Sequence, residues 1–376
     1  MRTVSDYIIV GAGIIGCAIA RELAQRFPGK RIYVLEKNDA PGLETSRLNS
    51  GVIHSGLHLN PKFLKAQFAR EGGKKVIEFC KAHGVPYRKC GMVIVGNMPK
   101  PKEVAKVFFQ LIALSQLVWR ARRQCIPIRF FSGKRIRQFQ PAIRAVLGIG
   151  VEEVYMIDPI ACTRAVYDEA QKLGAVFHFS RKVKSVERGR NGYFLKTEGS
   201  DDVFESIRLI NAAGLGAHDI AKMAGYPHDV FFYSGEYYRV KTEKKNRMNN
   251  VLVYPALRSG SPGLGIHITK RLDGEVYLGP NASLRADPEV PLDQRTPPEV
   301  FVDAVKPFWP EITAADLEWA YAGIRPKTAL HGEADFIISK ESEGPTLINL
   351  IGIESPGLTA SLSIAEHVAD MIMNNE

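Results

Sequence analysis

Near the start of the chain, an uninterrupted run of apolar residues, Tyr7–Val10, is followed by a cluster of glycines and then by apolar residues at helical spacing. A short apolar run bounded by turn residues is typical of a buried strand, and the segment from Ile14 to Phe27 has the periodicity of a helix. A second segment, Arg31–Lys37, has the apolar residues Ile32–Leu35 at its centre and predicts another strand. These residues therefore predict a strand-helix-strand unit, as in parallel sheets covered by helices.

Two later segments show a different pattern, in which apolar and polar residues alternate. They are Phe231–Val240 and Leu252–Ala282, the second interrupted by Gly and Pro turns. Alternation is typical of half-buried antiparallel strands, so we expect a second sheet here. The closing segment Gly352–Ile372 instead has Ser, Pro and Gly start signals followed by apolar residues at helical spacing, which predicts a final helix.

Composition limits the class of protein. A chain of 376 residues with 45% hydrophobic content can bury a large core and suits two domains or one elaborate domain. Its five cysteines are scattered without a CxxC pair, so we expect no disulfide framework, no metal site and a reducing compartment. The first strand begins close to Met1 and no apolar run reaches the roughly 18 residues of a spanning helix, so we expect a cytoplasmic protein.

The net charge of +10 is concentrated in one segment. Val104–Val151 contains nine basic residues and no Asp or Glu. Within it, the apolar residues of Lys106–Phe131 recur near helical spacing, and Arg120, Arg122 and Arg123 stand at the end of that pattern. This pattern suits a helix packed on the protein with its basic end in water, or a helix that lies peripherally in a membrane interface.

The glycines after the first strand form a GxGxxG pattern of Gly11, Gly13 and Gly16. Between a strand and a helix, the first allows a tight turn, the second lets a pyrophosphate approach the backbone, and the third lets the helix lie close to the strand. The second strand ends near Glu36, whose carboxylate can hydrogen-bond a ribose hydroxyl and repel a 2′-phosphate. The sequence therefore predicts an adenine dinucleotide as ligand.

The next segment, Leu48–Ala66, carries two histidines, two glycines and two lysines, unlike the continued alternation of a nicotinamide dehydrogenase. Here the chain resembles the flavin-dependent oxidoreductases of the D-amino-acid oxidase type. The resemblance lies in VGAGIIG with Glu36, in Thr45–Gly56, in Leu209–Ala221 and in Gly352–Ile372. Within this family, NSGVIHSGL, GIRPK and GIESPGLTASLSIAE look most like L-2-hydroxyglutarate dehydrogenases or oxidases.

This resemblance implies FAD as cofactor and an α/β fold, in which an FAD-binding Rossmann-like domain of the glutathione-reductase type is joined to a substrate domain with an antiparallel sheet. We expect residues 1–80, 146–226 and 326–376 in the FAD domain and residues 81–145 and 227–325 in the substrate domain. The implied FAD contacts are Gly11, Gly13, Ile14, Ile15, Gly16, Glu36, Lys37, Thr45, Ser46, Asn49, Ser50, Gly51, Val52, Val183, Ala213, Gly214, Gly323, Arg325, Glu354, Ser355, Pro356, Gly357, Leu358 and Thr359.

Candidate catalytic residues follow from the same resemblance. In relatives that oxidise hydroxy acids and amino acids, the arginine of a GxRP motif binds the substrate carboxylate; here it is Arg325, and a guanidinium fork suits two carboxylate oxygens. Either His267 or His54 would accept the hydroxyl proton, and the sequence leaves the choice open. It also leaves open whether His54 carries the flavin covalently. Tyr254 is a further candidate, although a tyrosine here more often forms a wall.

The expected reaction is hydride transfer from a small 2-hydroxy acid, with conversion of L-2-hydroxyglutarate to 2-oxoglutarate as the first choice. Glycerol-3-phosphate or amine oxidation is the alternative within the family, and a basic membrane-surface or RNA-binding flavoprotein is the alternative from another class. No RNA module is recognisable, so we expect no nucleic-acid partner. Without a second GxGxxG, electrons are expected to leave to oxygen, a quinone or an electron-transfer protein. Charged residues at His58, Lys62 and Lys65 favour a solvated helix face.

Overall fold

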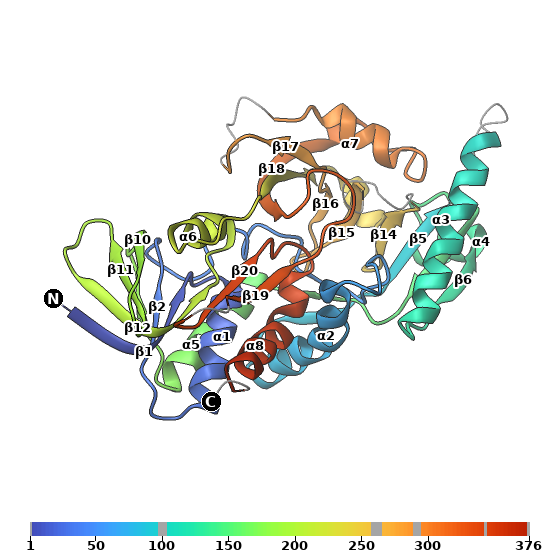
Figure 1. The fold of residues 1–376 in the computed structure, drawn as a ribbon. Helices are drawn as coiled ribbons and strands as arrows, with labels where there is room; N and C mark the ends of the chain where they lie inside the picture. The colour runs from blue at the N-terminus through green and yellow to red at the C-terminus, as the bar shows by residue number, and fades with distance from the viewer. Residues whose placement is uncertain (1, 97–103, 257–264, 289–294, 342–343, 374–376) are drawn as a thin grey trace.

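Two large sheets organise the molecule (Figure 1). The computed structural model describes residues 2–96, 104–256, 265–288, 295–341 and 344–373. Within these ranges the strands form one sheet of eight strands, one of nine and a small one of three.

The eight-stranded sheet has a parallel centre. Strand β1 (Arg2–Val10) pairs in parallel with β2 (Ile32–Leu35) on one side and with β12 (Val203–Asn211) on the other. The parallel pairing continues outward to β9 (Val176–His178) and to β20 (Leu347–Ile351). Three antiparallel strands complete the sheet: β10 (Val183–Arg188), β11 (Tyr193–Thr197) and β19 (Ile337–Glu341).

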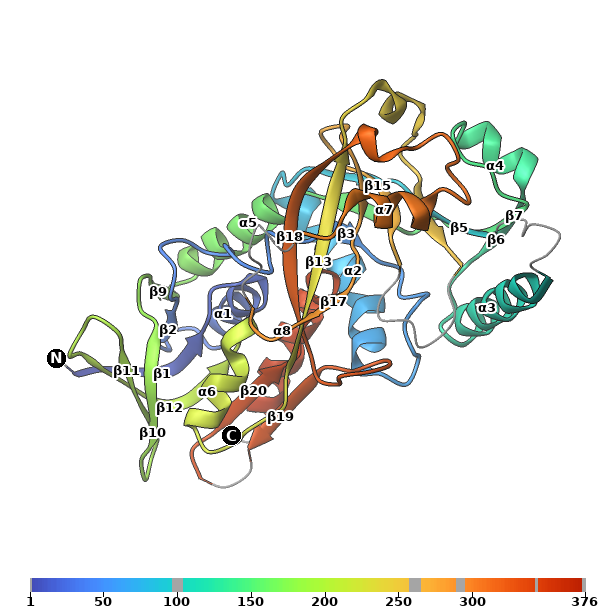
Figure 2. The ribbon, with the colours of Figure 1, turned by 90° about the horizontal axis from the view of Figure 1, so that it is seen from above.

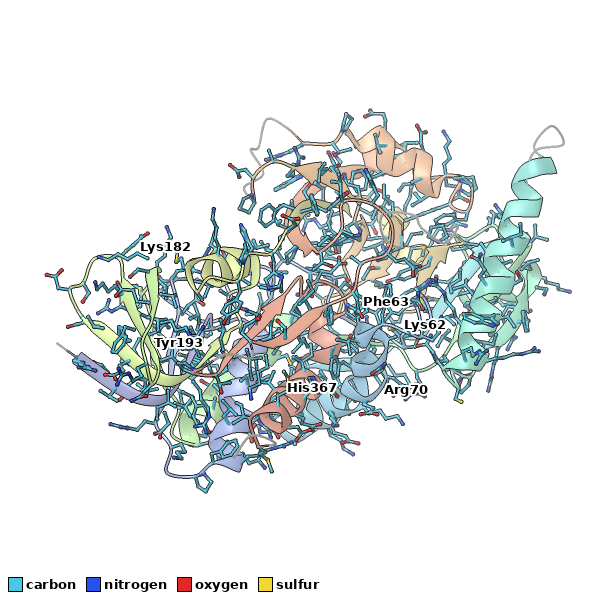
Figure 3. The ribbon with its side chains drawn as sticks, viewed as in Figure 1. Lys62, Phe63, Arg70, Lys182, Tyr193 and His367 are labelled. Carbon is cyan, nitrogen blue, oxygen red and sulfur yellow. The ribbon has the colours of Figure 1, made fainter. Side chains whose placement is uncertain are left out.

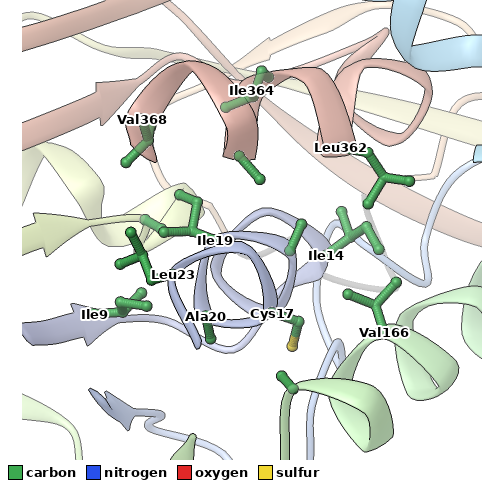
Figure 4. Packing of buried hydrophobic residues seen from close by; sticks show 14 of the residues in the cluster. Ile9, Ile14, Cys17, Ile19, Ala20, Leu23, Val166, Leu362, Ile364 and Val368 are labelled. Atoms are coloured by element: carbon green, nitrogen blue, oxygen red, sulfur yellow. The ribbon is translucent and has the colours of Figure 1, made fainter. Parts of the chain in front are cut away.

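Helices cover both faces of this sheet, which explains why the final part of β1, Tyr7–Val10, is apolar without interruption. Tyr7 and Ile9 pack in a core with α1 (Ile14–Arg26), α5 (Pro159–Lys172) and α8 (Gly357–Met373), and Figure 4 shows α1 at the centre of that core. Ile8 and Val10 face the other way, toward α6 (Ala217–Met223). Helix α2 (Leu64–Ala82) packs beside α8.

The nine-stranded sheet is largely antiparallel and contains most of the strands that the sequence assigns to the expected substrate domain. Its longest strands, β13 (Phe231–Val240) and β18 (Leu317–Lys327), run side by side through the molecule (Figure 2). A core containing the fully buried Trp309, Phe301 and Phe308 covers it together with α7 (Pro298–Val305). The other strands are β5 (Met92–Gly96), β6 (Arg129–Ser132), β7 (Leu147–Val151), β14 (Leu252–Pro255), β15 (His267–Lys270), β16 (Val276–Gly279) and β17 (Ser283–Arg285).

The remaining elements are short or peripheral. The small sheet joins β3 (Val52–Ile53), β8 (Tyr155–Ile157) and β4 (Tyr87–Lys89). Helix α3 (Val104–Arg123) and helix α4 (Gly133–Phe139) lie at the end of the molecule away from the first sheet (Figure 1). Short 3₁₀ helices occupy Gly214–Gly216, Glu243–Arg247 and Ala314–Asp316. None of the described helices is long and apolar enough to cross a membrane.

The predicted fold class is confirmed: a parallel sheet covered by helices is joined to an antiparallel sheet. Two strands cross the boundaries expected between the FAD domain and the substrate domain. Strand β7 pairs with β5 and β6 in the second sheet, and β18 continues in that sheet to Lys327. The division into two domains stays a prediction, with these strands on the substrate side.

Candidate functional site

The glycine turn between β1 and α1 is fixed by close packing on the end of β12. Gly11 has a φ of +100°, and a side chain on it would meet the carbonyl oxygen of Ala212 at 2.5 Å. A Cβ on Gly16 would lie only 1.9 Å from the carbonyl oxygen of Gly11. Helix α1 begins at this turn without a side-chain cap, while the backbone N–H of Ile14 donates to Ser46 Oγ at 2.9 Å. The turn therefore presents backbone to the adjoining cavity.

Glu36 stands beside this turn and is 7% exposed. Its carboxylate accepts hydrogen bonds from the backbone N–H of Ala12 at 2.7 Å and from the backbone and side chain of Asn38 at 2.9 Å. A carboxylate offers about four acceptor sites, and these three hydrogen bonds leave one site that can accept from a ribose hydroxyl. Val183 begins β10 two residues after Arg181, whose N–H donates to the Glu36 carbonyl. Lys37 points outward and pairs with Glu44 at 2.6 Å.

One continuous cavity runs from the glycine turn to the second sheet. It reaches most of the predicted residues: Gly13, Ile14, Ile15, Thr45, Ser46, Asn49, Ser50, Val52, His54, Gly214, His267, Gly323, Arg325, Glu354, Ser355, Pro356, Gly357, Leu358 and Thr359. The other predicted residues do not line it: Gly11, Gly16, Glu36, Lys37, Gly51, Val183, Ala213 and Tyr254. Of these, Gly11, Gly16 and Glu36 shape the turn from behind.

The loop that carries Asn49 is fastened by the side chain of that residue. Asn49 Nδ2 donates to the carbonyl oxygens of Ser46 at 2.7 Å and Thr45 at 3.2 Å, and Asn49 Oδ1 accepts from the N–H of Gly51 at 2.8 Å. Gly51 packs against Ile157 outside the cavity. Asn49 therefore holds the loop in shape, while the loop backbone and Ser50 face the cavity.

The N-terminus of α8 forms another wall. Thr359 Oγ1 accepts from the backbone N–H of His54 at 3.1 Å and donates to the carbonyl oxygen of Val52 at 3.5 Å, which joins the helix to the strand β3. Helix α2 lies close behind, because Gly72 leaves no Cβ to meet the Thr359 carbonyl at 2.5 Å. A helix N-terminus facing the cavity favours negative charge there.

His267 presents an unpartnered nitrogen to the cavity. The residue is 3% exposed, and its Nδ1 lies 2.8 Å from the carbonyl oxygen of Gly265. A carbonyl only accepts, so Nδ1 carries the proton and Nε2 is the free acceptor. No hydrogen-bond partner for Nε2 exists among the described residues. Tyr254 stacks on the ring at 3.9 Å, and its fully buried side chain forms a wall behind His267.

Three histidines near this end of the cavity are held neutral at pH 7. Burial lowers the pKa of His54 to about 4. Burial, with smaller contributions from His54 and Arg120, lowers the pKa of His58 to about 3. Burial also lowers the pKa of His267 to about 3, and the positive charge of Arg325 contributes to that shift. Neutral imidazoles can accept a proton, so the site provides acceptors without adding charge.

Arg325 lies on β18 opposite Tyr233 of β13, and its guanidinium lies over Gly235, where a Cβ would approach Nη2 to 2.8 Å. Among the described residues, no carboxylate forms an ion pair with it. Burial raises the pKa of Tyr237, a neighbour that lines the same cavity, while the charges of Arg325 and Arg271 oppose this shift. Arg325 is therefore a cation without an anionic partner at the cavity wall.

The expectation of a solvated face at His58, Lys62 and Lys65 was wrong for two of the three residues. Lys62 is exposed near the start of α2 (Figure 3). Lys65 is only 6% exposed, pairs with Glu354 at 3.1 Å and lies 5.1 Å from the centre of the Phe336 ring. His58 lines the cavity and stacks near Tyr254. Sequence spacing gave no signal for this, because the groups that bury them come from distant segments.

The basic end of α3 also differs from the expectation of a solvated end. Arg120 donates to the carbonyl oxygen of His58 and forms an ion pair with Glu333 at 2.6 Å. The buried Gln124 amide donates to the carbonyl of Gly56 at 3.3 Å. Arg122 and Arg123 are exposed. The end of α3 thus holds two loops that line the cavity, a role that sequence analysis missed.

The residues fit the expected cofactor. The cavity begins at a glycine turn that would exclude side chains, and it runs past a helix N-terminus toward a buried histidine and an arginine that has no carboxylate partner among the described residues. Backbone amides at a helix N-terminus bind a pyrophosphate, and a glycine turn with an acid beside it suits an adenosine ribose. Among the described residues, no cluster of metal-ligating side chains is present.

Comparison with known proteins shows which family the chain resembles. Residues 6–371 match the model of the family described as FAD dependent oxidoreductase. L-2-hydroxyglutarate dehydrogenase of Arabidopsis thaliana, a mitochondrial protein, is 30% identical over 98% of this chain and 83% of its own length. The Escherichia coli K12 L-2-hydroxyglutarate dehydrogenase is 31% identical over 74% of this chain and 64% of its own length.

A solved structure supports the same assignment. The dithionite-reduced L-alpha-glycerophosphate oxidase of Mycoplasma pneumoniae with FAD bound superposes with a TM-score of 0.87 at 26% identity, over 98% of this chain and 95% of that one. The resemblance inferred from the sequence motifs is confirmed. The chain belongs to the family of FAD-dependent oxidoreductases, and FAD is its cofactor.

Proposed function

We propose that this protein oxidises L-2-hydroxyglutarate to 2-oxoglutarate. The curated relatives that match over most of the chain carry that activity in their names. The observation that carries the proposal is that one cavity holds two groups without partners among the described residues: Arg325, which has no ion-pair partner, and His267, whose Nε2 has no hydrogen-bond partner. A 2-hydroxy acid needs both groups, one for its carboxylate and one for its hydroxyl proton.

Each residue then has one role. The Arg325 guanidinium holds the C1 carboxylate through two parallel hydrogen bonds, which orients the adjacent carbon. His267 Nε2 accepts the hydroxyl proton as the C–H bond is broken. FAD supplies the hydride acceptor for this family of reactions. Tyr237 and the α8 N-terminus line the cavity and reduce the space open to water.

Substrate binding also prepares the base. In the free protein the positive charge of Arg325 contributes to the low pKa of His267, after burial. A carboxylate bound to Arg325 offsets that charge, so it raises the basicity of His267 when the substrate is in place. His54 is the alternative base. Its pKa is also lowered by burial. Among the described residues, no hydrogen bond to a carbonyl fixes the tautomer of the His54 ring, as Gly265 does for His267, so we assign the proton to His267.

The second candidate function is oxidation of glycerol 3-phosphate, favoured by the similarity to L-alpha-glycerophosphate oxidase. Steady-state activity with an artificial electron acceptor, measured on L-2-hydroxyglutarate, glycerol 3-phosphate and several amino acids, separates the candidates. We expect the highest kcat/KM with L-2-hydroxyglutarate and no release of ammonia from the amino acids. A higher kcat/KM with glycerol 3-phosphate, or stoichiometric ammonia, contradicts the proposal.

We further propose that the enzyme docks on anionic lipid through 106–131, which would bring it near a quinone acceptor. Exposed apolar side chains support this: Ile112, Trp119 and Phe130 are 36%, 51% and 68% exposed. Arg122 and Arg123 are exposed beside them, and an arginine-rich helix end suits an anionic surface. Cosedimentation at low salt should recover more protein with anionic than with neutral vesicles. Equal recovery with the two kinds of vesicle contradicts docking. Unchanged recovery with anionic vesicles in a variant that combines Trp119→Ser and Arg123→Ser contradicts it as well.

A further inference from the structure

The cavity is lined by more positively charged than negatively charged side chains. They are Lys65, Arg325, Lys327, Glu333 and Glu354. The ammonium of Lys65 is paired with Glu354, and Glu333 is paired with Arg120 of α3. Among the described residues, this leaves Arg325 and Lys327 as two cavity cations with no ion-pair partner. The proposed function uses only Arg325.

Lys327 is the more buried of these two cations. It is 7% exposed, and its ammonium lies 5.2 Å from the centre of the Tyr233 ring. The Tyr233 hydroxyl is already engaged, because it donates to the carbonyl oxygen of Leu330. No hydrogen bond joins the Lys327 ammonium to another described group. A buried ammonium is unfavourable without a partner, and Lys327 lines this cavity, so a ligand in the cavity can supply that partner.

The strand sets the spacing between the two cations. Arg325 and Lys327 are two residues apart on β18, opposite Tyr233 and Phe231 of β13. Residues two apart on a strand point to the same face and stand roughly 6.6 Å apart. The terminal carboxyl carbons of an extended five-carbon diacid are about 5 Å apart, from four C–C bonds. One five-carbon diacid can therefore reach both cations.

We infer that Lys327 binds the distal carboxylate of the substrate and so selects short dicarboxylic 2-hydroxy acids over monocarboxylic ones. This inference rests on the proposed function for the role of Arg325 at C1. Lys327 touches the substrate away from the reacting carbon, so it determines specificity and leaves the chemistry of proton removal to His267. A monocarboxylic acid of equal length would leave the buried ammonium unpaired, which is the physical basis of the selection.

The kinetic test compares two substrates of equal carbon number, L-2-hydroxyglutarate and L-2-hydroxypentanoate, on the FAD-loaded enzyme. Lys327→Met should lower kcat/KM for the diacid roughly tenfold to hundredfold, the range of one charge-assisted hydrogen bond, and leave the monoacid unchanged or improved. Lys327→Arg should retain most of the preference for the diacid. Lys62→Met is the matched control, an exposed lysine whose loss should change neither value.

A binding test separates this inference from the proposed reaction. Glutarate and pentanoate carry no hydroxyl at C2 and are not substrates, and a change in the flavin absorbance is the expected signal when either acid fills the site. Glutarate should bind the parent at least tenfold more tightly than pentanoate, and Lys327→Met should abolish that difference. If neither 2-hydroxy acid is oxidised but glutarate still binds through Lys327, the site is supported and the reaction is refuted.

Other outcomes overturn the inference. Equal losses for both acids in Lys327→Met, at unchanged FAD content, would make Lys327 a structural residue. The inference would also fail if the parent enzyme had equal kcat/KM values for the diacid and the monoacid. Glycerol 3-phosphate supplies a dianionic phosphate of related chemistry, and Lys327-dependent binding of it that is tighter than that of glutarate would reassign the subsite to phosphate.

Discussion

The two ends of the cavity are built in different ways. At the nucleotide end, the cavity begins at a backbone turn shaped by residues close in sequence: Gly11, Gly13 and Gly16, with Glu36 directly after β2. At the other end, where we propose that the substrate binds, the wall is made of side chains from separate segments: His54, His58, His267, Arg325 and Lys327. The nucleotide end must exclude side chains, whereas the substrate end depends on particular side chains and their charges.

This difference predicts how each end fails. A substitution at the nucleotide end disturbs the backbone packing, so we expect it to abolish FAD binding or to prevent folding. A change at the substrate end alters one contact, so the protein folds and binds FAD but loses one property of the reaction. The predictions below separate these two kinds of failure.

The largest effect is expected for Gly16→Val. Because a Cβ at this position would lie 1.9 Å from the Gly11 carbonyl oxygen, α1 cannot keep its position against β1. We expect the variant to be colourless or insoluble, as measured by FAD per chain after purification. Gly216→Ala is the control, since a Cβ there has no atom within 4 Å and the residue has no positive φ. A yellow, stable Gly16→Val protein would contradict the packing argument.

His267→Ala should slow flavin reduction by L-2-hydroxyglutarate by about 10²- to 10⁴-fold at unchanged FAD content. Affinity for glutarate should stay similar, because His267 is needed only for the proton. The same change at His54 should have the smaller effect, and stopped-flow reduction without an acceptor measures both. With a His267 pKa of about 3, this group should give the parent enzyme no loss of kcat/KM between pH 5 and 8. A larger loss at His54 reverses the assignment.

Arg120→Ala should have an intermediate effect, on KM more than on kcat. It removes the contact to the His58 carbonyl and the ion pair with Glu333, so both cavity loops lose a common support. We expect a rise in KM of a few-fold, as for a part-buried ion pair. Arg123→Ala is the matched control, because Arg123 is exposed at the same helix end. Equal effects of the two changes would mean that α3 does not act on the cavity.

The smallest effect concerns stability and pH. The pKa values of His54, His58 and His267 lie near 4, 3 and 3 in the folded protein and about 6.5 in the unfolded chain. The unfolded chain therefore binds more protons below pH 6.5, so stability is full above that pH and falls as the pH is lowered toward 4.

Melting temperatures at pH 7.5, 6 and 5 measure this loss, and His58→Phe should reduce its slope. Asp316 does not obscure the result. Burial raises its pKa, but hydrogen bonds from Lys244 and Thr313 bring it down to about 2, so its contribution is lost only below about pH 4. An unchanged slope in His58→Phe would show that His58 is not the source.

Much of the fold was predictable because its signals are local. The Tyr7–Val10 run, the GxGxxG turn and the final helix follow from residue spacing alone, and all three are present. The alternation in Phe231–Val240 predicted β13 over the same residues. These elements depend on neighbours in sequence, where periodicity and turn chemistry act.

By itself the sequence determined the dinucleotide turn, the family and the candidates Arg325, His54 and His267, because each stands in a recognisable local pattern. Only the tertiary structure decided that His267 has the free nitrogen, that Lys65 and Arg120 are already paired, and that Lys327 is not. Those facts depend on Gly265, Glu354, Glu333 and Tyr233. Pairing and burial are set by which distant segments meet, and one-dimensional spacing carries no such information.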